Sequence, residues 1–396
     1  MRTLYELSAR LIDQTPLTYV RDCISVIDGK DRMIGIKGSR GAGKTTLLLQ
    51  YLKIKNFQQS GVYITLEDLY FSDNRLIDFA DSFVKNGGKF LFVDEVHHYL
   101  NWSKELKLIY DRYPELKVVF TGSSLLHIRK SKGDLARRMY MYNLNGLSLR
   151  EYINLTEGTS FSKFELLDIL ENHQKIANTI RKKIKPVQKY NEYITYGYYP
   201  FFLDNIYTYS FKLAESVNLI LKSDIPHATQ LNIGNIEKIR QLLYIIGASV
   251  PFKPNIQKIS ERTGISRNTL KLYFHYLSEA KIIYTLYPHN KGVSLLTKPE
   301  KVYLHHPNLM YAIARENENK GTLRETFFLN QVGNVLSVHY PVQGDFFVSG
   351  KYTFEVGGQN KTFRQIKNIK DSYLVLDDIE TGFKNEIPLW LFGFLY

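Results

Sequence analysis

The sequence has little of what marks secreted, disulfide-linked or membrane-spanning chains. Cys23 is the single cysteine among 396 residues, which excludes an intramolecular disulfide and a cysteine-rich metal site. No apolar run reaches the roughly 18 residues of a membrane-spanning helix, and residues 1–7 lack the apolar core of a signal peptide. These absences predict a cytoplasmic protein without a membrane partner, in which Cys23 is a small core residue.

Acidic residues are also scarce relative to basic ones. The chain has 52 Lys and Arg against 39 Asp and Glu, a net charge of +13. The excess lies in the first 290 residues, because residues 291–396 carry 12 basic and 11 acidic side chains. This balance favours a polyanionic partner, and a solvated basic surface explains it equally well. A chain of this length exceeds one hydrophobic core, so two or three domains are expected.

One stretch of the sequence carries a specific chemistry. Residues 38–45 fit the phosphate-binding pattern G-x-x-x-x-G-K-[ST], with an apolar strand pattern before it and a helical pattern after it. The glycines let backbone N–H groups point at an anion, and the helix N-terminus adds partial positive charge. We expect nine residues to contact ATP: Gly38, Ser39, Arg40, Gly41, Ala42, Gly43, Lys44, Thr45 and Thr46.

A second stretch supplies acids for the same site. Lys44 is predicted to reach the β- and γ-phosphates, and the Thr45 hydroxyl to hold Mg²⁺. Residues 89–95 form an apolar run that ends in Asp94 and Glu95. A run without alternation predicts a strand buried on both faces of a parallel sheet, with its carboxyl end at the ligand site. Asp94 is therefore predicted to hold Mg²⁺ and Glu95 to act as general base toward the attacking water.

Candidates for sensing the γ-phosphate follow a third buried strand at residues 117–123. Ser123 is the first choice for a hydroxyl that contacts the γ-phosphate or aligns the water, and Thr121 is the second. Turn chemistry explains these residues almost as well. Arg137 and Arg138 are both candidates for an arginine finger, acting in cis or on a neighbouring subunit of a nucleotide-dependent oligomer.

The chain after residue 155 is predicted to begin with a helical lid over the nucleotide, residues 156–235. Residues 152–189 have a helical and increasingly basic pattern, and Pro186 is expected to end that helix. The basic run before Pro186 is interpreted as a solvated face. Aromatic rings at 196–202 are able to stack on bases, but core packing is favoured, because the run joins two helices.

Residues 236–296 have the pattern of a winged helix-turn-helix domain. Helices are expected at 255–262 and 266–280, with Ser266 as the N-cap of the second, and a strand suited to a wing at 281–286. In a DNA-binding domain, the start of the second helix enters the major groove of double-stranded DNA. Contact with a protein partner is an equally weighted alternative. The exposed candidates for DNA contact are Arg267, Asn268, Thr269 and Lys271.

Residues 297–396 are predicted to form a small α+β domain. One acid on a helix, one at the start of a strand and one in the next strand resemble the metal-binding core of PD-(D/E)xK nucleases. Such carboxylates can hold Mg²⁺ and activate water on a phosphodiester. Gly357 stands where these nucleases have a lysine, so weak or absent cleavage is expected. The residues of this second candidate site, which we expect to lie close together, are Glu325, Asp345, Glu355 and Lys361.

The motifs together resemble a large group of bacterial and archaeal AAA-like ATPases of the ATP-switch type, which carry a C-terminal domain related to restriction endonucleases. The stretches that carry the resemblance are residues 38–48, 92–99 with Trp102, 120–124, 135–138 and 145–152. It implies a RecA/AAA-like parallel sheet in residues 1–155, Mg-ATP binding and slow hydrolysis. The sequence thus predicts an α/β P-loop ATPase that acts as a nucleotide-dependent switch on its winged-helix and C-terminal domains. The alternative is a DNA-binding regulator or Mg²⁺-dependent nuclease whose assembly ATP controls.

Overall fold

The computed structural model describes residues 1–57, 60–127, 135, 137–226, 236–248, 253–289, 297–314 and 319–396. The chain forms two compact units, the first made of Met1–Gly146 with Asp224–Leu231 and the second of Leu147–Ser223 with Asn232–Tyr396. The four domains expected from the sequence stay a prediction, because these units divide the chain more coarsely. In the described part of the chain, no helix is both long and apolar enough to cross a bilayer.

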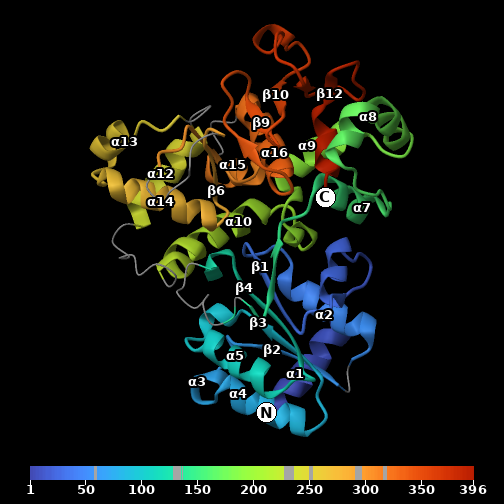
Figure 1. Cartoon of the computed structure of the whole chain (residues 1–396), viewed down its shortest axis with the longest axis vertical. Coiled ribbons are helices and arrows are strands. Elements are labelled where there is room, and N and C mark those ends of the chain that lie inside the picture. Colours follow the sequence, from blue (N-terminus) through green and yellow to red (C-terminus); the bar gives the residue numbers. More distant parts are fainter. Residues whose placement is uncertain are drawn as a thin grey trace. The chain divides into compact units, whose positions relative to one another are not determined.

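The first unit is built on a parallel five-stranded sheet in the order β2-β3-β4-β1-β5 (Figure 1). Its strands are β1 (Met33–Gly38), β2 (Gly61–Thr65), β3 (Phe90–Asp94), β4 (Lys117–Ser123) and β5 (Tyr140–Leu144). The predicted α/β fold with a central parallel sheet is confirmed. Because all strands run in one direction, their carboxyl ends meet at one edge, where Gly38 is in register with Ser123 and Thr65 with Asp94.

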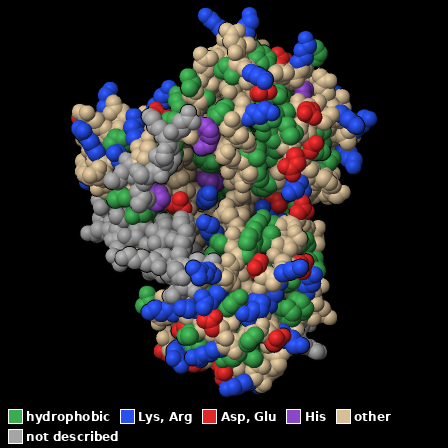
Figure 2. Space-filling model, viewed as in Figure 1, with side chains coloured by type: hydrophobic (Ala, Val, Ile, Leu, Met, Phe, Trp, Pro, Cys, Tyr) green, Lys and Arg blue, Asp and Glu red, His purple; other side chains and the backbone are tan. Residues whose placement is uncertain are grey.

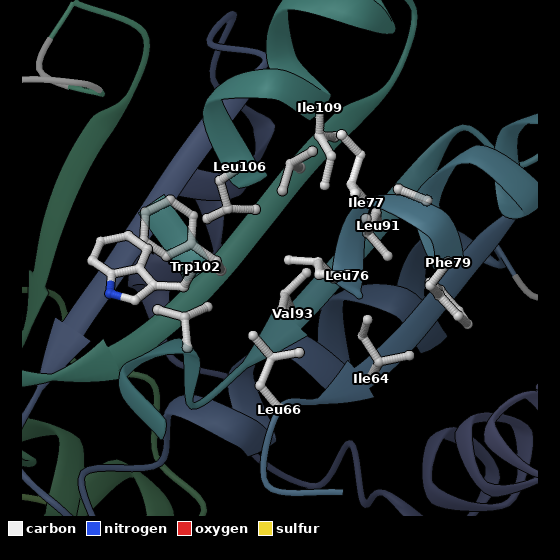
Figure 3. Close-up of a cluster of buried hydrophobic side chains, with 14 of the residues drawn as sticks. Ile64, Leu66, Leu76, Ile77, Phe79, Leu91, Val93, Trp102, Leu106 and Ile109 are labelled. Carbon is white, nitrogen blue, oxygen red and sulfur yellow. The ribbon is translucent and has the colours of Figure 1, made fainter. Parts of the chain in front are cut away.

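Helices cover both faces of this sheet, which explains its uninterrupted apolar strands. They are α1 (Arg2–Gln14), α2 (Lys44–Lys55), α3 (Tyr70–Asp73), α4 (Leu76–Lys85) and α5 (Trp102–Arg112), with 3-10 helices η1 (Asp22–Asp28), η2 (Val96–His98) and η3 (Ser124–His127). In β3, Leu91 and Val93 pack with α4 and α5 on one face (Figure 3). Phe92, which lies between them, packs with α2 on the other face. Both faces of the strand are therefore buried.

The second unit begins with three helices where the sequence predicted one continuous pattern. They are α7 (Leu149–Glu157), α8 (Leu166–Arg181) and α9 (Pro186–Glu192). Gly158 ends α7 with a left-handed backbone, φ 62°. Pro186 begins α9 and does not end a helix, so that prediction was wrong. Proline suits the first helical turn because its missing N–H has no helical partner there.

The aromatic run that follows α9 packs inside the second unit. It is followed by α10, and the elements here are the π-helical η4 (Tyr193–Gly197), the 3-10 helix η5 (Pro200–Leu203), α10 (Tyr209–Leu219), the π-helical η6 (Ile220–Asp224) and α12 (Ile236–Ala248). Tyr198 stacks on His306 with ring centroids 4.0 Å apart. Tyr152 contacts Phe202 at 5.3 Å. These rings are core residues, as the packing interpretation predicted.

A helix–turn–helix pair lies in the middle of the second unit. Its helices are α13 (Ile256–Thr263) and α14 (Arg267–Glu279), followed by β6 (Ile283–Leu286), which pairs antiparallel with β7 (Lys301–Leu304). The predicted N-cap is confirmed, since the Ser266 hydroxyl accepts a hydrogen bond from the Thr269 N–H at 3.2 Å. Gly264 makes the turn with φ 65°. The winged-helix assignment of these elements stays a prediction.

The last part of the chain is a mixed sheet in the order β12-β11-β10-β9-β8 (Figure 1). Its elements are α15 (Pro307–Ile313), α16 (Lys320–Gly333), β8 (Val338–His339), β9 (Phe346–Val348), β10 (Tyr352–Gly357), η8 (Phe363–Gln365), β11 (Ser372–Leu376), β12 (Glu386–Pro388) and η9 (Leu389–Phe394). Strands β8, β9 and β10 form an antiparallel meander, and β11 runs parallel to β10. Phe328 of α16 packs on Phe346 and Phe354, so α16 lies against the meander.

Candidate functional site

The phosphate loop connects β1 to α2, in the strand–loop–helix order that the sequence predicted. Gly41 and Gly43 have φ values of 82° and 91°, in a region where other residues are strained. A side chain at Gly38 would collide with the carbonyl oxygen of Leu144 in β5. The glycines of the motif are therefore required by the backbone path of the loop and by the close approach of β5.

The Lys44 side chain lies over this loop. It is only 5% exposed, and its Nζ donates to the carbonyl oxygens of Gly38 and Ser39 at 3.4 Å each. The same Nζ is 3.5 Å from Oε1 of Glu95. The ammonium group is thus held between the loop backbone and an acid, where it can be transferred to an incoming phosphate without reorganising the core.

The Asp94 carboxylate is the centre of the site, and side chains from three elements converge on it. Its Oδ2 accepts hydrogen bonds from the Thr45 hydroxyl at 2.6 Å and from the Tyr63 hydroxyl at 2.8 Å. Its Oδ1 accepts from the Glu95 N–H at 3.1 Å and from the Thr121 hydroxyl. Burial and the Asp94 charge raise the pKa of Tyr63 far above its ordinary value, so Tyr63 remains a hydrogen-bond donor.

The same residues fit a magnesium ion carried by a nucleotide. A threonine hydroxyl and a carboxylate lie side by side at the carboxyl end of the sheet, and hard oxygen atoms are what Mg²⁺ prefers. Thr45 and Asp94 are the residues that would hold it. Such an ion would neutralise phosphate charge next to Lys44.

Glu95 is held in a strained conformation beside the loop. Its φ of 52° lies in the left-handed region, which a residue with a side chain rarely adopts. Oε2 of Glu95 is 3.1 Å from Nδ1 of His97, and Nε2 of His98 is 3.0 Å from Oε1 of Glu67. Among the described residues, Glu95, His97 and His98 are the one group whose metal-ligating atoms all lie within 4.8 Å of one another. His97 orients Glu95, a role that the sequence analysis did not assign.

The Ser123 hydroxyl contacts a residue that sequence reasoning missed. It lies 3.5 Å from Oδ2 of Asp224, which is 101 positions later in the chain and only 6% exposed. Burial raises the pKa of Asp224, and the charges of Arg40 and Lys44 oppose this rise. Asp224 thus brings a carboxylate into the surroundings of the phosphate loop. No local motif marks it, because it follows an ordinary helical pattern.

The other predicted residues are less closely joined to the loop. Arg138 pairs with Asp111 of α5, with Nε 2.8 Å from Oδ1, whereas Arg137 is exposed. The arginine-finger assignment therefore stays a prediction for both. Thr46 is exposed on the first turn of α2. Arg21, which the sequence analysis did not consider, donates to the carbonyl oxygens of Ala42 at 3.3 Å and Asn145 at 2.8 Å and so ties the loop to the end of β5.

The structure also brings together the four residues of the second candidate site. Asp345, directly before β9, accepts a hydrogen bond from the Val356 N–H in β10 at 3.0 Å. Glu355 of β10 pairs with Lys361 at 2.6 Å. Burial and the Asp345 charge raise the pKa of both Glu325 and Glu355. The sequence analysis missed Lys301 of β7, whose Nζ is 3.3 Å from Glu325 and 3.4 Å from Asp345.

Two family matches cover separate parts of the chain. Residues 30–153 match a family described as an AAA domain, and residues 187–320 match a domain of unknown function. The first match covers the loop, β3 and β4, so an AAA-type P-loop domain accounts for the site described above. No curated protein sequence matches the chain.

Solved structures similar to the chain include three that contain AAA-type domains. The structure of Aeropyrum pernix ORC1 protein in complex with DNA has a TM-score of 0.32 and 11% identity, over 78% of this chain and 92% of that one. A katanin self-assembly structure gives 0.27 and 13%, over 40% of this chain and 57% of that one. Caenorhabditis elegans ("C. elegans") PCH-2 gives 0.24 and 18%, over 37% and 42%. This chain spans less than two thirds of the latter two, and such similarity is too low to indicate a function.

Proposed function

We propose that this protein binds Mg-ATP at the phosphate loop and hydrolyses it, and that the bound nucleotide acts as a switch on the domains that follow. One observation carries the proposal. The Thr45 hydroxyl and the Asp94 carboxylate are in direct contact, 2.6 Å apart, and Glu95 and the buried Lys44 lie next to them. Phosphate, metal and water-activating groups are then all available at one edge of a parallel sheet.

Each residue has a defined task in this proposal. Loop N–H groups and Lys44 bind the β- and γ-phosphates, and Thr45 and Asp94 hold the magnesium ion. Glu95 accepts a proton from the attacking water, with its carboxylate oriented by His97 at 3.1 Å. The Ser123 hydroxyl is near enough to the site to contact the γ-phosphate. The left-handed backbone of Glu95 is consistent with strain retained for catalysis.

The switch part of the proposal rests on the path of the chain. Asp224–Leu231 belongs to the first unit, whereas the segments before and after it belong to the second. Asp224 contacts Ser123, the proposed γ-phosphate sensor. A change of charge at the γ-phosphate position therefore acts on a residue that is covalently joined to η6. Movement of such a segment is a common response of nucleotide switches.

A second candidate function is DNA binding through the helix–turn–helix pair. Arg267 and Asn268 at the start of α14 are exposed and Lys271 is partly exposed, as contacts with phosphate or guanine require. Protein contact explains the same surface equally well. On the face shown in Figure 2, Lys and Arg side chains are spread over the surface with Asp and Glu among them. Overall charge therefore does not decide between these partners.

The first prediction separates nucleotide binding from hydrolysis. Lys44→Ala is expected to abolish ATP binding, because it removes the cation that meets the phosphates. Glu95→Gln is expected to keep ATP bound and to slow hydrolysis by about 10²–10⁴-fold, the usual contribution of a general base. Fluorescent-nucleotide binding and phosphate release measure the two steps. Unchanged ATP affinity in Lys44→Ala would remove the site assignment, and an unchanged rate in Glu95→Gln would remove the assigned base.

The second prediction concerns the hydroxyl that orients Asp94. Tyr63→Phe keeps the buried ring but removes its hydrogen bond to the carboxylate, so the Mg²⁺ concentration for half-maximal ATP turnover is expected to rise about 10-fold or more. Tyr113→Phe is a matched control, because it removes a similar bond of 2.8 Å to Asp81 outside the site. Equal Mg²⁺ dependence of Tyr63→Phe and wild type would show that this bond does not support metal binding.

The third prediction concerns the carboxylate that faces Lys44 and Arg40. Asp224→Asn removes a negative charge from the surroundings of the γ-phosphate and is expected to tighten ATP binding about tenfold relative to ADP. Asp78→Asn is the control, since Asp78 is exposed and pairs with Arg75 at 2.8 Å on α4. An unchanged ratio of ATP to ADP affinity would exclude Asp224 from γ-phosphate discrimination.

The fourth prediction tests the DNA-binding candidate. Replacing Arg267 and Lys271 with Ala is expected to weaken retention on duplex DNA and to flatten the plot of log K against log salt by about 2. Replacing the exposed Lys367 and Lys370 removes the same charge elsewhere and is the control. If retention is the same for all three proteins at every salt concentration, α14 does not contact DNA.

A further inference from the structure

The carboxylate cluster in the second unit already contains a buried cation. Lys301 is only 5% exposed, and its Nζ lies between Oε2 of Glu325 at 3.3 Å and Oδ1 of Asp345 at 3.4 Å. Tyr303, two residues later on the same strand, donates its hydroxyl proton to the same Oε2. Since β7 is paired with β6, the backbone that carries Lys301 is fixed, and the ammonium group is held against both acids.

The third acid of the cluster has a cation of its own. Oε1 of Glu355 is 2.6 Å from Nζ of Lys361. With its amide nitrogen turned toward this acid, Gln365 donates to the same oxygen at 2.9 Å. The cluster therefore holds three carboxylates and two ammonium groups, which leaves a net charge of −1. Burying three acids without such compensation is very costly, so the two lysines account for the stability of the group.

A divalent cation does not fit this arrangement. Mg²⁺ requires oxygen ligands at roughly 2.0–2.1 Å, which places the ligand atoms close together around one point. Within the described part of the chain, the one set of three ligand atoms that lie within 4.8 Å of one another belongs to Glu95, His97 and His98, and not to these three acids. The point between Glu325 and Asp345 is taken by an ammonium group, and a metal ion there would meet positive charge.

We infer that Lys301 is the resident cation of this cluster and takes the place of a catalytic divalent metal. The domain then has the carboxylates of a metal-dependent nuclease in a nuclease-like order of helix and strands, but does not bind the metal that phosphodiester cleavage requires. Its sheet and cluster serve as a folded module for contact or regulation. This inference does not depend on ATP binding, since every residue in it belongs to the second unit.

The inference makes Lys301 the residue that keeps a metal out. In Lys301→Met the side chain keeps its length and apolar stem but loses its charge, so the cluster has a net charge of −2 and two carboxylates without a cation. A divalent ion is then expected to bind between them. Lys361→Met removes the same charge from the same cluster but leaves Lys301 in place, so it is the matched control.

The test is Mn²⁺ binding to the full chain without nucleotide, followed by electron paramagnetic resonance. Lys301→Met is expected to gain a Mn²⁺ site that wild type and Lys361→Met lack, and to lose it again when Asp345→Asn is added. Wild type and Asp345→Asn are expected to bind the same amount of Mn²⁺. A wild-type site that disappears in Asp345→Asn, or a folded Lys301→Met that gains no site, overturns the inference. If Lys301→Met does not fold, the comparison of wild type with Asp345→Asn decides.

Discussion

The Asp94 carboxylate is the interaction on which the nucleotide site depends. Its two oxygens accept four hydrogen bonds, from Thr45 at the start of α2, Tyr63 in β2, Thr121 in β4 and the N–H of Glu95. Hydrogen bonds to a charged group are each worth about 1.5–3 kcal/mol, and hydroxyls left without their acceptor in the core cost about as much. The first turn of α2, the end of β3 and the end of β4 are therefore fixed relative to one another by one side chain that is 2% exposed.

The two acidic sites of this protein treat charge in opposite ways. Around Asp94 the partners are hydroxyls and a backbone N–H, which satisfy the oxygens without neutralising the charge. Around Glu325 and Asp345 the partner is the ammonium group of Lys301, which does neutralise it. A carboxylate of the first kind still attracts a cation, whereas one of the second kind is already compensated. The same residue types thus support a metal-dependent function in the first unit and a structural role in the second.

Local sequence patterns predicted most of the strands and helices around the nucleotide site because each element there has a local cause. The apolar run of β3, the glycines of the loop and the Ser266 cap depend on near neighbours in the chain. Strand β5 was missed because it is a partly exposed edge strand with no apolar run. Pro186 was misread because proline is compatible with both the end and the first turn of a helix.

The residues missed at the sites depend on tertiary contacts between distant parts of the chain. Asp224 meets Ser123 across 101 positions, and Lys301 meets Asp345 across 44. Neither spacing belongs to a motif, so only the fold reveals the pairs. The clustering of Glu325, Asp345 and Glu355 was expected from their places at the ends and starts of elements. The cation that joins two of them was not, because Lys301 lies on a strand outside that pattern.

The central claim is that the groups around Asp94 bind ATP together with magnesium. Calorimetric titration of the wild-type chain with ATP, in excess Mg²⁺ and again in excess EDTA, tests it most directly. The account predicts saturable binding of one ATP per chain with Mg²⁺ and markedly weaker binding without it, because Thr45 and Asp94 contribute through the metal. No saturable binding, or the same affinity in both solutions, would contradict it.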